Sequence, residues 1–395
     1  MDFIIPDKVI EERRENILKH MERDGIDLLY LVSPANIAYL SRFHFIPTER
    51  PMALLIYGDG ESKLYVPLLE KEHAEKYSYV DEVISYREYP DDVNPIEYLA
   101  KIISNDGKKV SNIGYDVDGY GHIFGFRGPR LSQVLRDVKF TYYRDVVEEM
   151  RLIKDEYEVR MLRESSRWTS LVHRLLQDYI EEGLYEDEVS MRASHDATMA
   201  MINELRGRYL PVGWITGAKA GFRGQIGEHS YYPHSLTQHT RFEKTQVLVT
   251  GAGACVSGYS VELERTMFFG RPSKEMEKYF NLMCKAQETA FEMIKPGNRC
   301  SDVDKEVRQF FRDNNLMAYW RHHTGHGIGL EYHEAPFLDI GDDREIKPGM
   351  VLTVEPGIYV KGLGGFRHSD TVLVTEDGIE LLTDYPRDIE SLTIE

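Results

Sequence analysis

Two glutamates at strand spacing, Glu262 and Glu264, are the side chains of this sequence with the clearest capacity for chemistry. They stand in the segment YSVELERT among apolar neighbours, and residues two apart in a strand point to the same face. Two carboxylates on one buried face need a metal ion, a cationic ligand or a shared proton to offset their burial and repulsion. The next residue, Arg265, is expected to point to the other face. An isolated Glu-X-Glu pair is more often solvated, so this pair alone does not define a site.

Histidines and a third carboxylate supply the support that the pair needs. His326 is flanked by glycines, which let the backbone approach closely, and His333 follows soon after it. Glu355 ends the apolar run Leu-Thr-Val and precedes Pro-Gly, so its charge is either at an edge or aimed into a site. His234, in Tyr-Pro-His-Ser, is unremarkable alone. Each residue has a structural explanation when it is taken singly, but together they predict a site.

The first part of the chain alternates between helical and strand patterns, which indicates an α/β domain. Gly25 is expected to end the first helix. The expected elements are helices at Asp7–Asp24, Ile96–Ile103 and Leu131–Leu135, and strands at Leu28–Val32, Met52–Tyr57, Lys63–Val66, Ile113–Tyr115 and Phe140–Tyr143.

The second part must position the candidate site, and its pattern predicts an α+β domain with helices against a mixed, mostly antiparallel sheet. Helices are expected at Asp155–Glu181, Tyr185–Leu205, Lys274–Ile294 and Ser301–Asn314. Strands are expected at Tyr209–Thr216, Thr245–Cys255, Tyr259–Phe269, Val351–Tyr359, Phe366–Thr375 and Ile379–Leu382. We place the two domains at 1–148 and 149–395.

Composition limits the classes of function. A chain of 395 residues favours two domains, and its 48 basic and 66 acidic residues give a formal charge of −18. So acidic a chain is not expected to bind nucleic acid or anionic membranes. Three scattered cysteines, without a signal-peptide or membrane-span pattern, favour a cytoplasmic protein.

These motifs resemble the pita-bread hydrolase family, which includes prolidase, aminopeptidase P, methionine aminopeptidase and creatinase. The resemblance covers the whole chain, and it is carried by Met150–Lys154, Pro296-Gly297, Gly325–Gly329, His333–Pro336, Val354–Gly357 and Val372–Gly378. It implies an N-terminal α/β creatinase-like domain followed by a pita-bread catalytic domain.

The metallopeptidases of this family bind two divalent ions through Asp, Asp, His, Glu and Glu. The resemblance places these ligands, in order, on Gly251, Glu262, His326, Glu355 and Ser369. Glycine has no side-chain ligand, and a hydroxyl is a poor substitute for a bridging carboxylate. We therefore expect no two-metal centre. One ion such as Mn, Co, Fe or Zn on Glu262, His326 and Glu355 is the alternative.

The segment LERT looks instead like creatinase, which hydrolyses a C–N bond without metal, and ectoine hydrolase is similar in using a Glu there. The resemblance implies that His234 is the catalytic histidine and that Glu264 and Glu355 hold the substrate's nitrogen-rich group. Arg50 matches the arginine that creatinase contributes from the partner subunit to bind a substrate carboxylate, which implies a homodimer. Phe337 replaces a second such arginine, so creatine itself is not expected.

Our leading hypothesis is a metal-independent hydrolase that cleaves an amidine, guanidino or amide C–N bond in a small compound bearing a carboxylate. His234 would be the general acid/base, and Glu264 or Glu355 could be the nucleophile. Glu262, His326 and His333 would contact the substrate. The alternative is a Xaa-Pro dipeptidase-like metallopeptidase with one remodelled metal site. The third hypothesis is a non-catalytic pita-bread binding protein.

Overall fold

The computed structural model describes residues 2–120, 125–213 and 217–395, and these fold into two compact units. One unit is built mainly from Ile5–Arg151, and the other contains the N-terminal residues up to Ile4 and most of the chain from Leu152 on. The change falls close to the boundary expected at 148–149. None of the helices in the described residues combines the length and the apolar character that a membrane crossing needs.

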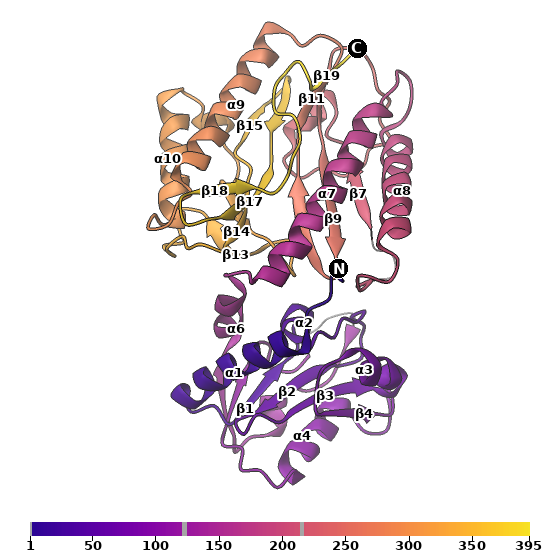
Figure 1. Ribbon diagram of the computed structural model, residues 1–395, viewed down its shortest axis with the longest axis vertical. Coiled ribbons are helices and arrows are strands. Elements are labelled where there is room, and N and C mark those ends of the chain that lie inside the picture. The colour runs from indigo at the N-terminus through magenta and orange to yellow at the C-terminus, as the bar shows by residue number, and fades with distance from the viewer. Residues whose placement is uncertain (1, 121–124, 214–216) are drawn as a thin grey trace. The chain divides into compact units, whose positions relative to one another are not determined.

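The first unit is a six-stranded mixed sheet with helices, as the alternating pattern predicted (Figure 1). The strands lie in the order β4-β3-β2-β1-β5-β6. They are β1 (Leu28–Leu31), β2 (Ala53–Tyr57), β3 (Ser62–Pro67), β4 (Glu82–Tyr86), β5 (Asn112–Tyr115) and β6 (Lys139–Tyr142). The helices are α1 (Asp7–Asp24), α2 (Pro34–Ser41), α3 (Lys71–Tyr77), α4 (Pro95–Asn105), α5 (Leu131–Val134) and α6 (Arg144–Arg151). Gly25 ends α1 in the left-handed conformation, with φ of 64°, which glycine adopts without steric cost.

The second unit contains the candidate site. Its helices are α7 (Glu156–Asp178), α8 (Glu186–Leu205), α9 (Lys274–Met293) and α10 (Cys300–Asp313). Its strands are β7 (Ala218–Gly221), β8 (Gln246–Val249), β9 (Gly251–Val256), β10 (Tyr259–Leu263), β11 (Thr266–Phe269), β12 (Gly325–Gly327), β13 (Glu334–Leu338), β14 (Val351–Val354), β15 (Gly357–Val360), β16 (Gly364–Arg367), β17 (Asp370–Val374), β18 (Ile379–Leu381) and β19 (Thr393–Ile394). Asp155 caps α7 by accepting hydrogen bonds from the Tyr157 and Glu158 amides.

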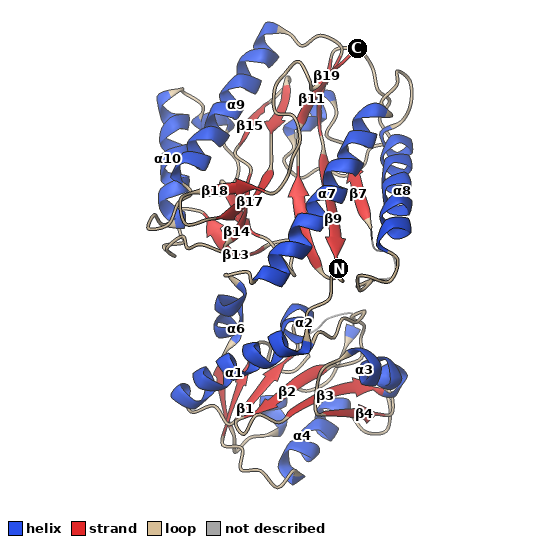
Figure 2. Ribbon diagram, viewed as in Figure 1, coloured by secondary structure: helices blue, strands red, loops and turns tan. Residues whose placement is uncertain are grey.

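Helices cover the sheets of this unit in two pairs (Figure 2). Helices α7 and α8 pack on each other and on β7 and β9, while α9 and α10 pack on each other near β13 to β16. The sheets have the orders β10-β9-β7, β19-β11-β8, β13-β12-β14-β17-β18 and β15-β16. Most of their pairings are antiparallel, which confirms the α+β prediction.

Five expected strands differ from the structure. Three of them are each divided into two strands: Thr245–Cys255 into β8 and β9, Val351–Tyr359 into β14 and β15, and Phe366–Thr375 into β16 and β17. The strand predicted at Tyr259–Phe269 is split into β10 and β11, and Glu264 lies at the break. There its backbone bridges to Ser369, which joins two sheets at the candidate site. The strand predicted at Tyr209–Thr216 is wrong over its described part, where Tyr209 makes only an isolated bridge to Phe3. Its last residues, from 214 on, lie outside the described residues.

Candidate functional site

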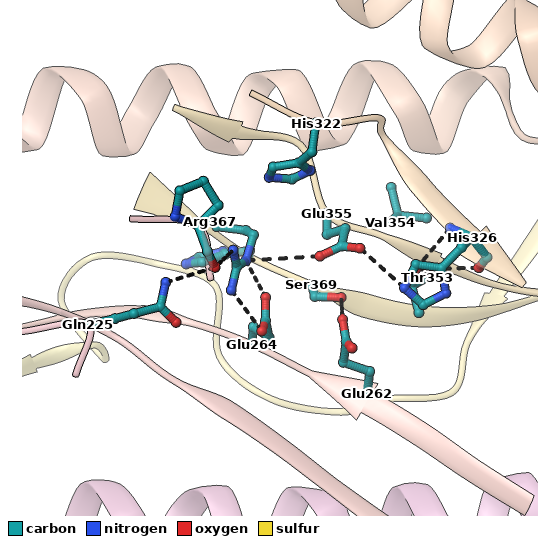
Figure 3. Close-up of polar contacts among 12 residues, drawn as sticks. Gln225, Glu262, Glu264, His322, His326, Thr353, Val354, Glu355, Arg367 and Ser369 are labelled. Atoms are coloured by element: carbon teal, nitrogen blue, oxygen red, sulfur yellow. Dashed lines mark hydrogen bonds and ion pairs between the residues drawn. The ribbon is translucent and has the colours of Figure 1, made fainter. Parts of the chain in front are cut away.

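The predicted acidic residues and His326 do come together, at the meeting of β10, β12, β14 and β17 (Figure 3). Glu262 lies on β10, His326 on β12, and Glu355 directly follows β14. Carboxylate oxygens of Glu262, Glu264 and Glu355 all lie within 4.8 Å of one another. Three carboxylates this close, on a largely buried face, require positive charge or protons nearby.

Glu264 obtains that positive charge from two arginines. Arg367, at the end of β16, contacts both carboxylate oxygens, with Nη2 at 2.8 Å from Oε1 and Nε bonded to Oε2. Arg223 donates from Nη2 to the same Oε1 at 2.6 Å. Arg265 does not take part, because it is buried on the other side and pairs with Asp370 at 2.7 Å, as its strand position predicted.

Glu262, unlike Glu264, forms no ion pair with an arginine among the described residues. Its Oε1 accepts a hydrogen bond of 2.8 Å from the Ser369 hydroxyl. Burial, with the charges of Glu355 and Glu264 beside it, raises the pKa of Glu262 to about 8. In the metal-free protein Glu262 therefore holds a proton at neutral pH. Ser369, on which the family resemblance places a bridging carboxylate, serves here as a hydrogen-bond donor.

His326 and Glu355 form the second charged pair. The Nε2 atom of His326 lies 3.3 Å from Glu355 Oε1, and its Nδ1 lies 2.9 Å from the Gly327 carbonyl oxygen. Because a carbonyl oxygen only accepts hydrogen bonds, Nδ1 must carry the hydrogen. The lone pair of Nε2 then faces the Glu355 carboxylate, unless a proton or a metal ion lies between Nε2 and the carboxylate. Burial lowers the pKa of His326, but the bond to Glu355 outweighs it and raises this pKa to about 9.

Glu355 is the carboxylate that stays ionised. Burial raises its pKa, but the close contact with His326 and the charges of His322, His326 and Arg367 outweigh that effect and bring it to about 2. A longer contact of 3.9 Å joins Glu355 Oε2 to Arg367 Nε. The strand-end position of Glu355 thus aims its charge into the cluster, as the sequence indicated.

His333 extends the site toward solvent. Its ring stacks on that of His326 at a centroid distance of 3.9 Å, and Tyr332 stacks on His333 at 6.0 Å. Burial and the charge of His326 lower the pKa of His333. Glu334, in contrast, leaves the site: it forms a buried ion pair of 2.8 Å with Lys154. The His-Glu-Ala-Pro motif therefore contributes its imidazole to the site and its carboxylate to packing.

His234 is exposed and lies beside the cluster. The preceding Pro233 carbonyl accepts a hydrogen bond from Arg367 Nη1 at 3.1 Å, and Gln225 Nε2 donates to the same carbonyl at 3.2 Å. The charge of His234 is close enough to lower the pKa of His333. No hydrogen bond of the His234 side chain is found among the described residues.

The site predicted from the sequence did not include Arg367, Arg223, Tyr359 or His322. Arg367 is the most important of them, because it pairs with Glu264. An arginine within an apolar strand segment could have revealed it, since a buried guanidinium needs a carboxylate partner. Tyr359 accepts a hydrogen bond of 2.8 Å from Arg367 Nη1 through its hydroxyl, which also lies 2.8 Å from His322 Nε2. These contacts fix the Arg367 guanidinium in place.

Arg50 belongs to the first unit, where its guanidinium pairs with Glu88 at 2.6 Å and with Glu49. The charge of Glu88, through this hydrogen bond, raises the pKa of Arg50. Its expected role, binding a carboxylate in a partner's site, stays a prediction.

The donor set fits one divalent ion better than two. Ligand atoms of Glu262, His326 and His333 lie within 4.8 Å of one another, and Glu355 adjoins the same histidine. Imidazole with carboxylates is a workable set for Zn, Mn, Co or Fe. A second ion at Glu264 would have to replace Arg367 and Arg223, while Gly251 and Ser369 offer it no carboxylate.

Comparisons with known proteins match both parts of the chain. Residues 160–376 match the model of metallopeptidase family M24, and residues 13–153 match the Creatinase/Prolidase N-terminal domain. An uncharacterized peptidase of Staphylococcus haemolyticus is 26% identical over 94% of this chain and 99% of its own length. The two-domain, α+β pita-bread architecture expected from the sequence is confirmed.

Two solved structures extend the likeness. The prolidase from Pyrococcus horikoshii has a TM-score of 0.79 at 26% identity and covers 96% of this chain and 99% of its own. A Xaa-Pro dipeptidase from Bacillus anthracis has a TM-score of 0.80 at 25% identity and covers 98% of this chain and 100% of its own.

Proposed function

The chain belongs to metallopeptidase family M24 and is a hydrolase of carbon–nitrogen bonds, and on that premise we propose that it is a dipeptidase for substrates with proline second, with one divalent ion in a remodelled site. The observation that carries the proposal is the convergence of Glu262, His326 and His333 ligand atoms within 4.8 Å, with Glu355 beside His326. This order of preference reverses the one expected from the sequence, because the family match and the prolidase likeness favour the metallopeptidase alternative.

The proposed ligands are Glu262, His326 and Glu355, with His333 as a further donor. The hydrogen bond from His326 Nδ1 to the Gly327 carbonyl leaves Nε2 as the atom available to an ion. A divalent ion bound there would polarise the scissile carbonyl and lower the pKa of a bound water.

The chain's own groups would perform the remaining tasks. His234 would pass a proton to the leaving nitrogen, because it is exposed beside the cluster and makes no hydrogen bond with the described residues. Arg367 would hold Glu264 and maintain positive charge where the related enzymes place their second ion. Under this proposal, proton transfer and charge stabilisation are tasks of different side chains.

The direct test is hydrolysis of Gly-Pro and Ala-Pro, with Gly-Ala as a control, by protein reconstituted with Mn²⁺, Co²⁺, Fe²⁺ or Zn²⁺. The proposal requires cleavage of the proline dipeptides that depends on added ion and is lost in Glu262→Gln. Equal cleavage with and without chelator would contradict it.

A second candidate, a metal-free hydrolase of an amidine, guanidino or amide bond, is favoured by one observation. Glu264 already has its cation in Arg367, and Gly251 and Ser369 lack ligating carboxylates. In that case the cation needed by Glu262 and Glu355 would belong to the substrate. Chelator-resistant turnover of guanidino or cyclic amidine acids, without cleavage of Gly-Pro, would select this candidate.

A further inference from the structure

Arg223 occupies a backbone position that costs energy. It follows β7 and has φ of 52°, and the next residue, Gly224, has φ of 72°. The left-handed region is unfavourable for a residue with a side chain, and such residues persist where the surrounding structure holds them. The Gly224 amide donates 2.7 Å to the buried Glu186 carboxylate, which fixes this turn. The turn therefore aims the Arg223 side chain at a defined place.

The guanidinium of Arg223 is only partly used within the described residues. It donates from Nη2 to Glu264 Oε1 at 2.6 Å, and the side chain is 44% exposed. Arg367, by comparison, is 3% exposed and uses all three guanidinium nitrogens on Glu264, Pro233 and Tyr359. An arginine has five N–H groups, so Arg223 keeps enough donors to bind a second anion.

Charge at this end of the site also favours an anion. Glu264 carries one negative charge, and two guanidinium groups contact it. The surplus positive charge lies on the exposed member, Arg223. The charge of Arg223 also lowers the pKa of Tyr332, which burial and the charges of Glu262 and Glu264 raise, so Arg223 lies close to the same residue as these carboxylates.

Two glycines of β9 leave the room that this arrangement needs. A Cβ atom on Gly251 would lie 3.4 Å from both Arg223 Nη2 and Glu264 Oε1, and one on Gly253 would lie 3.0 Å from the Tyr332 hydroxyl. The family resemblance places the first aspartate ligand of the metallopeptidases on Gly251. Glycine has no side chain to occupy the space beside the guanidinium of Arg223.

We propose that Arg223 is the substrate-carboxylate binding residue of this site and that it acts within the same chain, in the space left by Gly251. For the dipeptide substrates of the proposed function, on which this assignment rests, the bound group would be the carboxylate of the C-terminal proline. The remaining N–H groups of Arg223 fit a carboxylate by charge-assisted hydrogen bonds.

The test is titration calorimetry with N-acetyl-L-proline and N-acetyl-L-prolinamide, which differ only in the carboxylate. The wild-type protein should bind the acid at least about tenfold more tightly than the amide, as expected for one charge-assisted contact. In Arg223→Gln the acid should lose that advantage, and the affinity for the amide should change little. Arg223→Lys should retain part of the preference.

Arg163→Gln is the matched control, because Arg163 is also exposed and donates from Nη2 to a glutamate, Glu380, at 2.7 Å. It should keep the full preference for the acid. Equal weakening of acid and amide in Arg223→Gln, or no preference in the wild type, would overturn the assignment. Gly-Pro hydrolysis, measured on the same preparations, separates the two proposals: its absence contradicts the proposed function, while the acid–amide ratio still decides the role of Arg223.

Discussion

Arg367 contacts both carboxylate oxygens of Glu264, and the two side chains are 3% and 4% exposed. Burial lowers the pKa of Arg367, but the charge of Glu264 outweighs it and keeps the pKa well above its usual value. Arg367 therefore keeps its positive charge. It places a permanent cation beside the acidic cluster, and this cation is part of the chain.

Replacing Arg367 by glutamine should destabilise the protein by about 3 kcal/mol, the lower end for breaking a buried ion pair, because Arg223 still contacts Glu264. Urea unfolding followed by circular dichroism measures the loss. The double variant Arg367→Gln with Glu264→Gln should lose less than the sum of the single variants, because it leaves no unpaired buried charge. If the double variant lost as much stability as the two single variants together, Arg367 and Glu264 would not be coupled.

Gly251 should tolerate alanine but not aspartate. The added Cβ would lie at 3.4 Å from Arg223 and Glu264, which is ordinary contact, whereas a carboxylate would enter the space of the guanidinium and approach Glu264. We expect Gly251→Asp to lower the melting temperature by several degrees, about 1–2 kcal/mol, and Gly251→Ala to leave it nearly unchanged. A stable Gly251→Asp protein that retains a second ion per chain would contradict the view that Arg223 replaces that ion.

The fold and the main acidic residues could be predicted from the sequence, but the arginine that neutralises Glu264 could not. Periodicity located α1 at Asp7–Asp24, and strand spacing placed Glu262 and Glu264 together. Arg367 was missed because its partner Glu264 lies about a hundred residues away, and tertiary contacts such as the bridge between Glu264 and Ser369 bring them together. Nor could spacing reveal that Glu334 would turn away from the site toward Lys154.

Stability of the metal-free protein should fall as pH rises toward 9. Glu262 has an ordinary pKa of 4.5 raised to about 8, and His326 has an ordinary value of 6.5 raised to about 9. A raised folded-state pKa gives stability below the unfolded value that is lost as pH rises through the folded value. Glu355, lowered from 4.5 to about 2, acts oppositely and loses its contribution as pH falls through that range.

Melting temperatures of the metal-free protein between pH 5 and pH 9 test whether stability falls as pH rises. The wild type should be most stable near the acidic end of the range. The decline toward pH 9 should be shallower in Glu262→Gln, which cannot ionise. An identical decline in that variant would show that Glu262 does not titrate there.

His234→Ala should lower kcat by about 10² to 10⁴, the usual range for a general acid or base, without changing the melting temperature. The residue is exposed and makes no hydrogen bond among the described residues, so its loss should cost no stability. His229→Ala, another exposed histidine five residues earlier, is the control and should keep full activity. Retained turnover in His234→Ala would exclude its role in proton transfer.

The most direct test of the central claim is the ion content of the purified protein. Protein incubated with Mn²⁺, Co²⁺, Fe²⁺ or Zn²⁺ and freed of excess metal should retain about one ion per chain by elemental analysis, because one set of carboxylate and imidazole ligands converges. Glu262→Gln and His326→Ala should each retain much less. Retention near zero in the wild type would contradict the one-ion site and favour the metal-free candidate, and retention near two would contradict the replacement of the second ion by arginine.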